Sequence, residues 1–245
     1  MITFETVTKT FGSKTPKRDN RRQVLKGVDF TLKRGELICL LGPSGCGKTT
    51  MINMIMGKLL PTTGTVTVMG ERAPYKAARP RIGYMPQEDA LYTDINGEEN
   101  LIFFGRMNGM KKAEARARAA EMLAFGRLAE DGKKMISEYS GGMKKRLSLG
   151  IAMMHEPELL ILDEPTVGLD PDHRRRIWHE FEKLADGGTT ILVTTHVMDE
   201  AMRCGKIAML YDGQMIAQGS PADILADTGC EDLEDAFLAM EARYE

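Results

Sequence analysis

Residues 42–49 read GPSGCGKT, which is the complete glycine-rich pattern G-x-x-x-x-G-K-[ST]. The apolar run 37–41 (LICLL) precedes it and the unbroken stretch 50–56 (TMINMIM) follows it, so its context is strand, turn and helix. Glycines let several backbone N–H groups point into one concavity, and a helix N-terminus adds a partial positive charge. The segment therefore predicts a phosphate-binding loop, and the chain is expected to bind a nucleotide.

Two side chains of this loop have defined tasks. Lys48 is expected to reach the β- and γ-phosphates, and the Thr49 hydroxyl is expected to bind Mg²⁺. Cys46 would be oxidant-sensitive if its thiol were exposed beside the helix N-terminus, and otherwise it is an inert small residue. The predicted nucleotide-binding residues are Gly42, Pro43, Ser44, Gly45, Cys46, Gly47, Lys48, Thr49 and Thr50.

Composition sets the outer limits of the interpretation. The 245 residues are enough for one large α/β domain or for one domain that carries a sub-domain. The net charge of −2 gives no global field that favours nucleic acid or anionic lipid, so we expect no nucleic-acid partner. No apolar run approaches the roughly 18 residues of a membrane span, so any membrane role is expected to go through a partner. The four cysteines have no C-x-x-C spacing, which favours reduced thiols in the cytoplasm.

Hydrophobic patterning predicts an α/β fold that an all-helical stretch interrupts. From about residue 93 to 154 no strand pattern is convincing, and helical patterns replace it. The predicted strands are residues 2–8, 24–33, 37–41, 65–68, 81–85, 159–164, 189–194, 206–211 and 214–218. The predicted helices are residues 50–56, 97–109, 111–125, 171–184, 197–203, 221–226 and 233–242, with one more that opens at residue 140 or 141.

A polar segment, residues 12–23, separates the first two predicted strands and contains five basic residues. It is predicted to be a solvated hairpin loop. Contact with phospholipid headgroups or with a partner is the alternative, because short basic clusters can make such contacts. Phe11 stands just before this segment and can stack on a base, although an aromatic residue at a strand end is usually packing.

Two carboxylates end the apolar strand at 159–164. Asp163 lies at the carboxyl end of a buried strand, where ligands of open α/β sheets bind, and it can hold Mg²⁺. Glu164 points elsewhere in the pleat and can polarise an attacking water as a general base. Gln87 follows another strand end and can contact the Mg²⁺ or the water. His196 follows the strand at 189–194 and can sense the γ-phosphate through its imidazole, whereas the other three histidines are interpreted as structural.

A second glycine-bearing helix start lies at residues 140–146 (SGGMKKR). A serine and two glycines that open a helix form an anion site with a capping hydroxyl and free N–H groups. One nucleotide already has its phosphates held by the first loop, so a second site is useful if it closes on another subunit's nucleotide. This pattern predicts head-to-tail dimerisation, with an ordinary glycine-bearing helix cap as the rival interpretation.

With both anion sites in view, the chain resembles the nucleotide-binding subunits of ATP-binding cassette (ABC) transporters over nearly its whole length. The motifs follow the order of that family. They are GPSGCGKT at 42–49, YMPQ ending at Gln87, SGGMKKR at 140–146, LLILDEP at 159–165, Gly168-Leu169-Asp170, and His196.

The resemblance implies a fold and a role for each motif. The fold is α/β: a P-loop NTPase core with a mostly parallel sheet, an antiparallel β sub-domain and a helical insertion, all in one ATP-binding domain over residues 1–245. The helical sub-domain is expected at about 88–139, and a signature helix from 140. The implied signature residues, which contact the partner's ATP, are Ser140, Gly141, Gly142 and Met143. Glu164 is implied as the catalytic base, with His196 and Gln87 as further catalytic residues. The implied Mg²⁺ shell is Thr49, Gln87 and Asp163. Asp170 is implied as a dimer contact, and Phe11 as the aromatic residue that stacks under adenine.

The chain departs from the family pattern in three places. Met143 stands where the signature usually has Gln, and Tyr139 replaces the Leu that usually precedes it. The stacking aromatic is Phe rather than the commoner Tyr, and the basic segment is longer than in many members. Serine and the glycines carry the phosphate contact and stacking needs a ring, so activity is expected to survive.

Residues 140–171 and 233–238 resemble cassettes whose partners are export-type membrane subunits of the ABC-2-like multidrug kind. The implied function is an ATPase that binds ATP and Mg²⁺, dimerises, and drives export through a separate permease at the cytoplasmic face of the membrane. The alternatives are a soluble cassette ATPase acting on ribosomes or DNA, an importer subunit, and a binding subunit with a silent site. One cassette, a slightly acidic charge and no long heptad run disfavour the first, and intact Lys48, Asp163, Glu164 and His196 disfavour the last.

Overall fold

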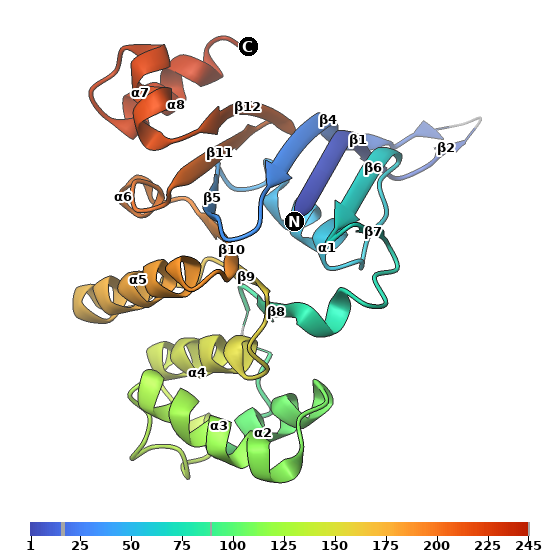
Figure 1. The fold of residues 1–245 in the computed structure, drawn as a ribbon. Helices are drawn as coiled ribbons and strands as arrows, with labels where there is room; N and C mark the ends of the chain where they lie inside the picture. The colour runs from blue at the N-terminus through green and yellow to red at the C-terminus, as the bar shows by residue number, and fades with distance from the viewer. Residues whose placement is uncertain (16–17, 89, 245) are drawn as a thin grey trace. The chain divides into compact units, whose positions relative to one another are not determined.

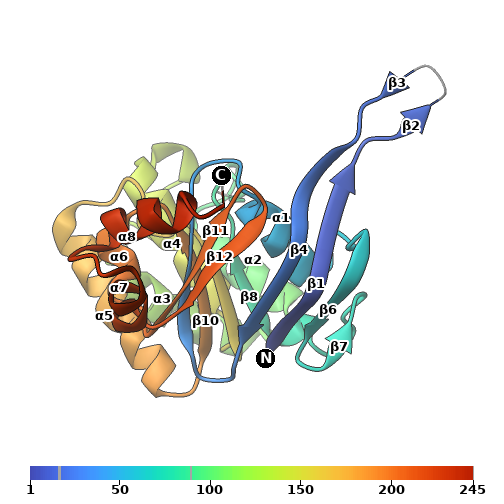
Figure 2. The same cartoon turned by 90° about the horizontal axis from the view of Figure 1, so that it is seen from above.

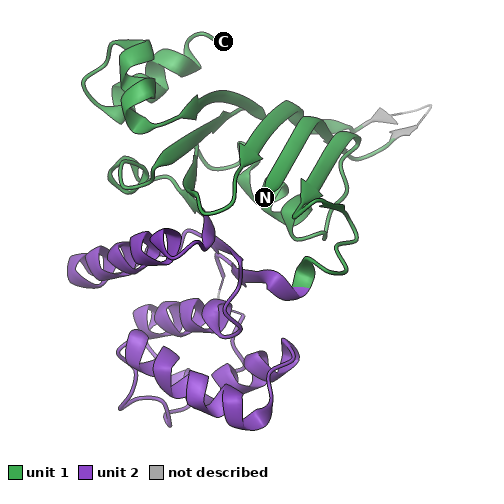
Figure 3. Cartoon of the chain, in the orientation of Figure 1, with its two compact units in different colours: residues 1–79, 192–245 green, residues 80–191 purple. Residues whose placement is uncertain are grey.

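The computed structural model describes residues 1–15, 18–88 and 90–244. The chain divides into two units (Figure 3). Unit 1 comprises Met1–Arg79 and Leu192–Glu245, and unit 2 comprises Pro80–Ile191. The glycine-rich loop therefore belongs to unit 1, whereas the two strand-end carboxylates and the SGGMKKR segment belong to unit 2.

An antiparallel sheet forms one half of unit 1. Its strands follow the order β4 (Arg22–Leu32), β1 (Ile2–Phe11), β6 (Thr63–Val68) and β7 (Glu71–Arg72), and they lie side by side in Figure 2. Phe4 and Phe30 pair across β1 and β4 with ring centroids 5.9 Å apart, inside the buried face. The predicted antiparallel strands are confirmed, and both extend further toward the basic segment than the pattern indicated.

The basic segment contains short strands where a loop was predicted. Strands β2 (Lys14–Thr15) and β3 (Arg18–Asp19) pair antiparallel. Two hydrogen bonds hold the base of this hairpin: the Ser13 amide donates to Asn20 Oδ1 at 2.9 Å, and the Asn20 amide donates to the Ser13 carbonyl at 3.3 Å. Lys17 of the predicted basic cluster lies outside the described residues.

A second group of strands has the order β12 (Gln214–Gly219), β11 (Lys206–Tyr211), β5 (Leu37–Leu41) and β10 (Thr190–Thr195), and all but the first two residues of β10 belong to unit 1. β5 runs parallel to β11, and β11 and β12 form an antiparallel hairpin. All five residues of β5 are buried, as its continuous apolar run predicts. Among its described residues, the unit also contains the helices α1 (Lys48–Ile55), α6 (Met198–Ala201), α7 (Pro221–Thr228) and α8 (Leu233–Glu241).

Unit 2 combines two parallel strands with helices. β8 (Ile82–Met85) pairs with β9 (Leu159–Asp163), and short 3₁₀ turns occur at Arg79–Arg81 and Ile136–Glu138. Helices α2 (Gly97–Met107), α3 (Lys112–Phe125) and α4 (Gly141–Met153) pack against one another, and α4 also packs on both strands (Figure 1). Helix α5 (Pro171–Asp186) also belongs to this unit.

Capping residues explain where the helices of unit 2 begin. Asn96 and Glu99 form a reciprocal capping box at α2, Ser140 caps α4, and Asp170 caps α5 with Pro171 in the first turn. The predicted helix starts at 97, 141 and 171 are confirmed. Among the described residues, no helix has both the length and the apolar character needed to cross a membrane.

Candidate nucleotide-binding site

The glycine-rich loop of unit 1 joins the end of β5 to the start of α1. Gly47 has φ of 118° and stands at the N-cap of α1, where it offers no side chain to close the first turn. The Cys46 amide donates to the Pro43 carbonyl at 3.4 Å, and the Gly213 amide donates to the Cys46 carbonyl at 3.1 Å. The β11–β12 turn thus anchors the outer side of the loop, and the helix N-terminus is left as a site for anions.

Lys48 lies across the loop. Its ammonium donates to the Gly42 carbonyl at 2.6 Å and to the Pro43 carbonyl at 3.0 Å. The side chain is buried, so its charge is held close to the loop rather than in bulk water. A phosphate entering the loop would find the cation preplaced, and it would take over from the two carbonyls.

At two of the loop glycines, neighbouring atoms leave no room for a side chain. A Cβ on Gly42 would lie 2.2 Å from the Leu210 carbonyl oxygen, and a Cβ on Gly47 would lie 2.7 Å from Leu25 Cδ2. Both distances are far inside van der Waals contact, so any other residue would displace the loop. The loop is therefore packed closely against β4 and β11 of its own unit.

The thiol of Cys46 is not exposed beside the helix. The residue is buried, and burial raises the pKa of its thiol, with Lys48 acting in the opposite direction. The condition for an oxidant-sensitive cysteine is not met, and Cys46 is the inert small residue of the two interpretations.

Phe11 stands at the end of β1 with a partly exposed ring. It pairs with Arg22 of β4, two residues before the Val24–Leu25 segment that touches Gly47. Two residues of strand span about 7 Å, so Phe11 lies near the strand segment that packs on the loop. Lys9 covers the ring, because its ammonium lies 5.1 Å from the ring centroid and donates to the Leu60 carbonyl at 2.8 Å.

In unit 2 the strand-end polar residues come together. β8 and β9 are parallel and in register up to the pair Met85–Leu162, so Gln87 and the two carboxylates emerge from the same edge. Gln87 Nε2 donates to Glu164 Oε2 at 3.0 Å. Asp163 is buried, and Glu164 has φ of 50°, a left-handed conformation that is strained for a glutamate. Such strain is common at functional sites.

Two neighbours support this group. Lys145 of α4 donates to the Gln87 carbonyl at 3.1 Å, which ties the SGGMKKR helix to the residue that contacts Glu164. Burial raises the pKa of Tyr84 on β8, and the Asp163 carboxylate raises it further. Tyr84 is therefore a neutral hydroxyl beside a buried carboxylate.

The SGGMKKR segment opens α4 as predicted, and Ser140 is the cap. Its Oγ accepts from the Met143 amide at 3.3 Å. Gly141 is exposed, and a Cβ added to it would meet nothing within 4 Å. Tyr139, which replaces the usual leucine, is buried and donates its hydroxyl to the Asp131 carbonyl at 2.9 Å. The departure at 139 is thus accommodated inside unit 2.

His196 follows β10 on an ordered turn of unit 1, and its side chain is exposed. The preceding Thr195 donates its hydroxyl to Glu200 Oε2 at 2.8 Å and accepts from the Val197 amide at 3.1 Å. These bonds fix the backbone on both sides of the histidine.

Comparison with known proteins agrees with this arrangement. The family model described as "ABC transporter" matches residues 25–167, which is more than half of the chain. The chain belongs to the ABC transporter family. It is 43% identical over 237 residues to the Nod factor export ATP-binding protein I of Paraburkholderia xenovorans, covering 95% of this chain and 75% of that protein. It is 42% identical to the linearmycin resistance ATP-binding protein LnrL of Bacillus subtilis, covering 94% of this chain and 72% of that protein.

Solved structures of cassettes have the same fold. An ATP-binding subunit of an ABC transporter aligns with a TM-score of 0.86 at 28% identity, over 98% of this chain and 99% of that chain. A dimeric ATP-binding cassette in a post-hydrolysis state, bound to ADP and Pi, aligns with a TM-score of 0.82 at 28% identity, over 90% and 98%. The expected ABC ATPase fold is confirmed, and the chain is an ATPase of this family that binds ATP.

Sequence reasoning missed three residues of this cassette. Lys9 covers Phe11, Lys145 holds the Gln87 carbonyl, and His173 contacts Asp170. Lys9 stands two residues before Phe11 on the same strand, a spacing that places both side chains on one face. The other two contacts join segments distant in sequence, and no local pattern announces them.

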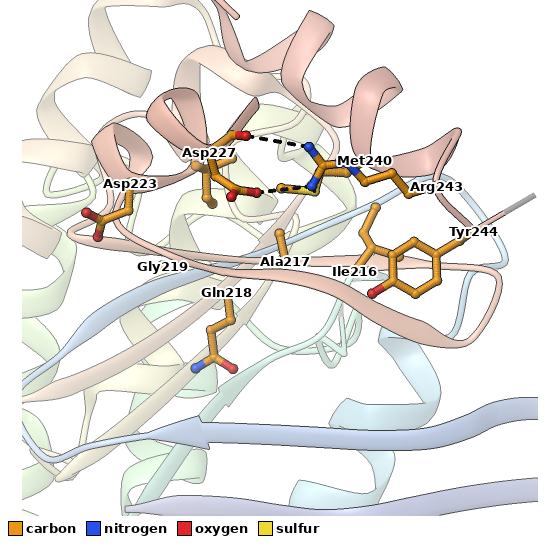
Figure 4. A pocket seen from close by; sticks show the side chains of 10 residues that line it. Ile216, Ala217, Gln218, Gly219, Asp223, Asp227, Met240, Arg243 and Tyr244 are labelled. Carbon is orange, nitrogen blue, oxygen red and sulfur yellow. Dashed lines mark hydrogen bonds and ion pairs between the residues drawn. The ribbon is translucent and has the colours of Figure 1, made fainter. Parts of the chain in front are cut away.

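A pocket of about 470 Å³ also lies in unit 1, between β12 and helices α7 and α8 (Figure 4). Asp227 and Arg243 form an ion pair across it at 3.1 Å. Its lining includes the apolar Ile216, Ala217, Ile224 and Met240, and it contains none of the predicted nucleotide-binding residues. The pocket and the predicted nucleotide-binding loop therefore share no lining residue.

Proposed function

We propose that this chain is the ATP-hydrolysing subunit of an exporter, working as a head-to-tail dimer that closes over two ATP molecules beside a separate membrane permease. The observation that carries the proposal is the pair of glycine-bearing helix N-termini in one chain. The first, at α1, is a complete phosphate loop with its lysine in place. The second, at α4, has exposed Ser140 and Gly141 at its start, and the first loop already serves the chain's own nucleotide, so a second copy of the chain is the natural source of its phosphate.

Each bound ATP is then held by two chains. In the first chain the loop amides and Lys48 hold the phosphates, and Phe11 stacks on the adenine. From the partner chain come the exposed Gly141, the half-buried Gly142 and the hydroxyl of Ser140, together with Met143 and Asp170. A serine hydroxyl can accept from the Met143 amide and donate to a phosphate oxygen at the same time, so the observed cap is compatible with this contact.

Hydrolysis is transfer of the γ-phosphoryl group to water. Glu164 accepts the proton of the attacking water as general base. Gln87 donates to one carboxylate oxygen of Glu164, which orients the other oxygen for the water. His196 donates to the γ-phosphate and so distinguishes ATP from ADP. Most of the rate enhancement comes from positioning and from neutralisation of phosphate charge.

The oxygen ligands that Mg²⁺ prefers are present in the predicted shell. Thr49 offers a hydroxyl, Asp163 a buried carboxylate and Gln87 an amide oxygen, since its nitrogen already donates to Glu164. These residues fit the ion. When bound, Mg²⁺ would supply charge neutralisation and polarisation at the β- and γ-phosphates. The protein residues around it keep their separate tasks of holding ATP and the water.

The permease partner is supported by an exposed apolar surface on unit 2. Tyr92, Phe103 and Phe104 form an aromatic cluster, with ring centroids 4.8 to 5.8 Å apart. Tyr92, which precedes α2, is 50% exposed, and Met107, on α2 with Phe103 and Phe104, is 67% exposed. Exposed apolar side chains gathered in one place indicate an interaction site. We propose that a cytoplasmic loop of the permease docks on this aromatic surface, which keeps the cassette at the cytoplasmic face of the membrane.

Export rather than import is favoured by the relatives. The protein from Paraburkholderia xenovorans is named for Nod factor export, and the one from Bacillus subtilis is named for resistance to linearmycin. The first name states export, the second states resistance to a compound, which export would provide, and both proteins align over more than nine-tenths of this chain.

The catalytic part of the proposal is tested with Glu164→Gln. The amide keeps the size of the side chain and removes the base, so ATP binding is retained while turnover falls by about 100-fold or more. A stable ATP-bound dimer accumulates because hydrolysis no longer opens it. Steady-state phosphate release and light scattering with and without ATP measure both effects.

Glu180→Gln is the matched control, because the Glu180 carboxylate pairs with Lys183 on α5 and should not affect turnover. If Glu164→Gln hydrolyses ATP like the wild type, the assignment of the base is wrong. If neither the wild type nor Glu164→Gln dimerises with ATP, the shared-site model is wrong.

The proposed docking of the permease on the aromatic surface is tested by asking which membrane protein co-purifies with the chain from detergent-solubilised membranes. The double variant Phe103→Ser with Met107→Ser should lose a co-purifying membrane protein and keep ATP binding. Leu60→Ser, at a side chain of unit 1 that is 59% exposed, should keep the membrane protein. Recovery of the wild type with ribosomes or DNA in place of a membrane protein would overturn the transporter assignment.

A further inference from the structure

A continuous chain of hydrogen bonds in unit 2 joins the SGGMKKR helix to Asp170. Arg146 Nε donates to the Gly142 carbonyl at 3.3 Å, and its Nη1 lies 2.7 Å from His173 Nε2. His173 Nδ1 lies 2.5 Å from Asp170 Oδ2, and the His173 amide donates to Asp170 Oδ1 at 3.1 Å. Both carboxylate oxygens of Asp170 are therefore held by one residue.

The chemistry of the three side chains fixes the direction of the bonds. A guanidinium has donors and no acceptor, so Nε2 of His173 must accept from Arg146. A neutral imidazole with an accepting Nε2 carries its proton on Nδ1, and that N–H donates to Asp170. The hydrogen bonds thus run in one sense, from Arg146 through His173 to Asp170.

The surroundings agree with a tied carboxylate. The hydrogen bonds from the His173 amide and then from its side chain lower the pKa of Asp170. Burial lowers the pKa of Arg146, and the Asp170 charge acts in the opposite direction. The side chain of His173 is 25% exposed, so it is a packed bridge between the two helices rather than a freely moving surface group.

We infer that His173 is a positioning residue that makes the signature segment (residues 140–143) and Asp170 move as one element of the dimer interface. This inference rests on the proposed function, in which both elements meet the partner chain. Gly142 belongs to the signature segment and also receives the Arg146 bond. When the signature segment shifts on the partner's ATP, the hydrogen bonds through Arg146 and His173 move the Asp170 carboxylate with it. Closure of one ATP site is thereby coupled to Asp170, the interface residue of the other ATP site.

Three substitutions at one position separate the two halves of this bridge. Asparagine places its amide N–H₂ near the position of Nδ1 and can keep the bond to Asp170, but it does not reach Arg146. Glutamine places an amide oxygen near Nε2 and can keep the bond from Arg146, but it loses the Nδ1 bond. Alanine loses both. His179→Ala on the same helix, with a side chain that is 64% exposed, is the matched control.

The variants are made in the Glu164→Gln background, and ATP-dependent dimerisation is measured by light scattering over a range of protein concentrations. We expect His173→Ala to raise the dimer dissociation constant about tenfold, with Asn and Gln in between and His179→Ala unchanged. ATP binding by the monomer, followed with a fluorescent nucleotide, should change less than twofold in every variant, which excludes a general folding defect.

A double-mutant cycle provides the readout that a merely structural role would not give. If the bridge acts as a unit, Arg146→Met combined with His173→Ala weakens the dimer no more than the stronger single change does. Additive effects in this cycle, or His173 variants that dimerise like the background, would overturn the inference while the dimer model stands. If the Glu164→Gln background itself does not dimerise with ATP, it is the proposed function that fails.

Discussion

Helix α1 begins after a glycine and helix α4 begins with two glycines, but their first turns are closed in different ways. At α1 the N-cap is Gly47, and the lysine of the first turn folds back onto the loop carbonyls. At α4 the N-cap is Ser140, whose hydroxyl accepts from the Met143 amide within the same chain. The loop before α1 (residues 42–49, the cradle) has no side-chain cap, whereas the first turn of α4 has a serine cap and contains two glycines. The difference indicates that α1 is built to hold an anion by itself, and that α4 is stable without one and adds contacts when a phosphate arrives.

The largest effect is expected from breaking the cradle. Gly47→Ala forces a side chain into a backbone with φ of 118° and against Leu25, so the loop must move. We expect a loss of about 1 to 3 kcal/mol in the free energy of unfolding and about a hundredfold weaker ATP binding. Denaturant unfolding and nucleotide titration measure the two.

Gly35→Ala is the control for Gly47→Ala. It also has positive φ, but a Cβ there would meet nothing within 4 Å, and Gly35 lies outside the loop. It should lose stability and keep ATP binding. Equal ATP affinities of the two variants would show that α1 does not depend on close packing of its cradle.

A smaller effect, confined to the dimer, is expected at the other helix. Ser140→Ala removes the cap of α4 and should lower the free energy of unfolding by about 1 kcal/mol. ATP binding by the monomer stays as in the wild type, whereas ATP-dependent dimerisation in the Glu164→Gln background weakens by about tenfold. Thermal unfolding and light scattering distinguish the two consequences.

Ser220→Ala removes an equivalent cap, since Ser220 Oγ accepts from the Asp223 amide at 3.1 Å at the start of α7. It should cost similar stability and leave the dimer intact. A dimer defect of the same size in both variants would mean that α4 contributes no more to the shared site than an ordinary helix start does.

The smallest effect concerns the adenine base of the ATP that the cradle holds. Lys9→Met removes the cation that covers Phe11 and should weaken ATP binding about two- to fivefold, which is the range of one cation–π contact. Binding of tripolyphosphate, which has no base, should not change. Lys26→Met, whose partner is Asp212, is the control. A loss of tripolyphosphate affinity would show that Lys9 acts on the phosphates and not through the aromatic ring.

Much of the fold follows from local pattern. The glycine-rich loop, the starts of α2, α4 and α5, and the β11–β12 hairpin depend on residues close in sequence, and each was predictable from caps, turns and periodicity. The short β2–β3 pair was not predictable, because its polar residues resemble a loop and pairing depends on the long strands that lead into it.

The candidate site also has residues that the local sequence predicts and residues that only long-range packing brings in. Residue types and positions indicated Lys48, Asp163, Glu164 and Gln87, since strand ends of a parallel sheet share an edge. The histidines show the limit of that reasoning. His173 has no motif around it, and its bond to Arg146 joins two helices that are separated by β9 in sequence. Contacts of this kind depend on helix packing, which a single sequence does not reveal.

The burial of Cys46 has a practical consequence. Its side chain sits inside the loop at 5% exposure, and its raised pKa keeps the sulfur protonated. An alkylating reagent can therefore reach it when the loop opens, and not in the closed state. Cys39 and Cys204 are also buried, and Cys230 is partly exposed. In a chain with Cys230 replaced by serine, the alkylation rate of Cys46, followed at its own peptide by mass spectrometry, would therefore measure how often the phosphate loop opens.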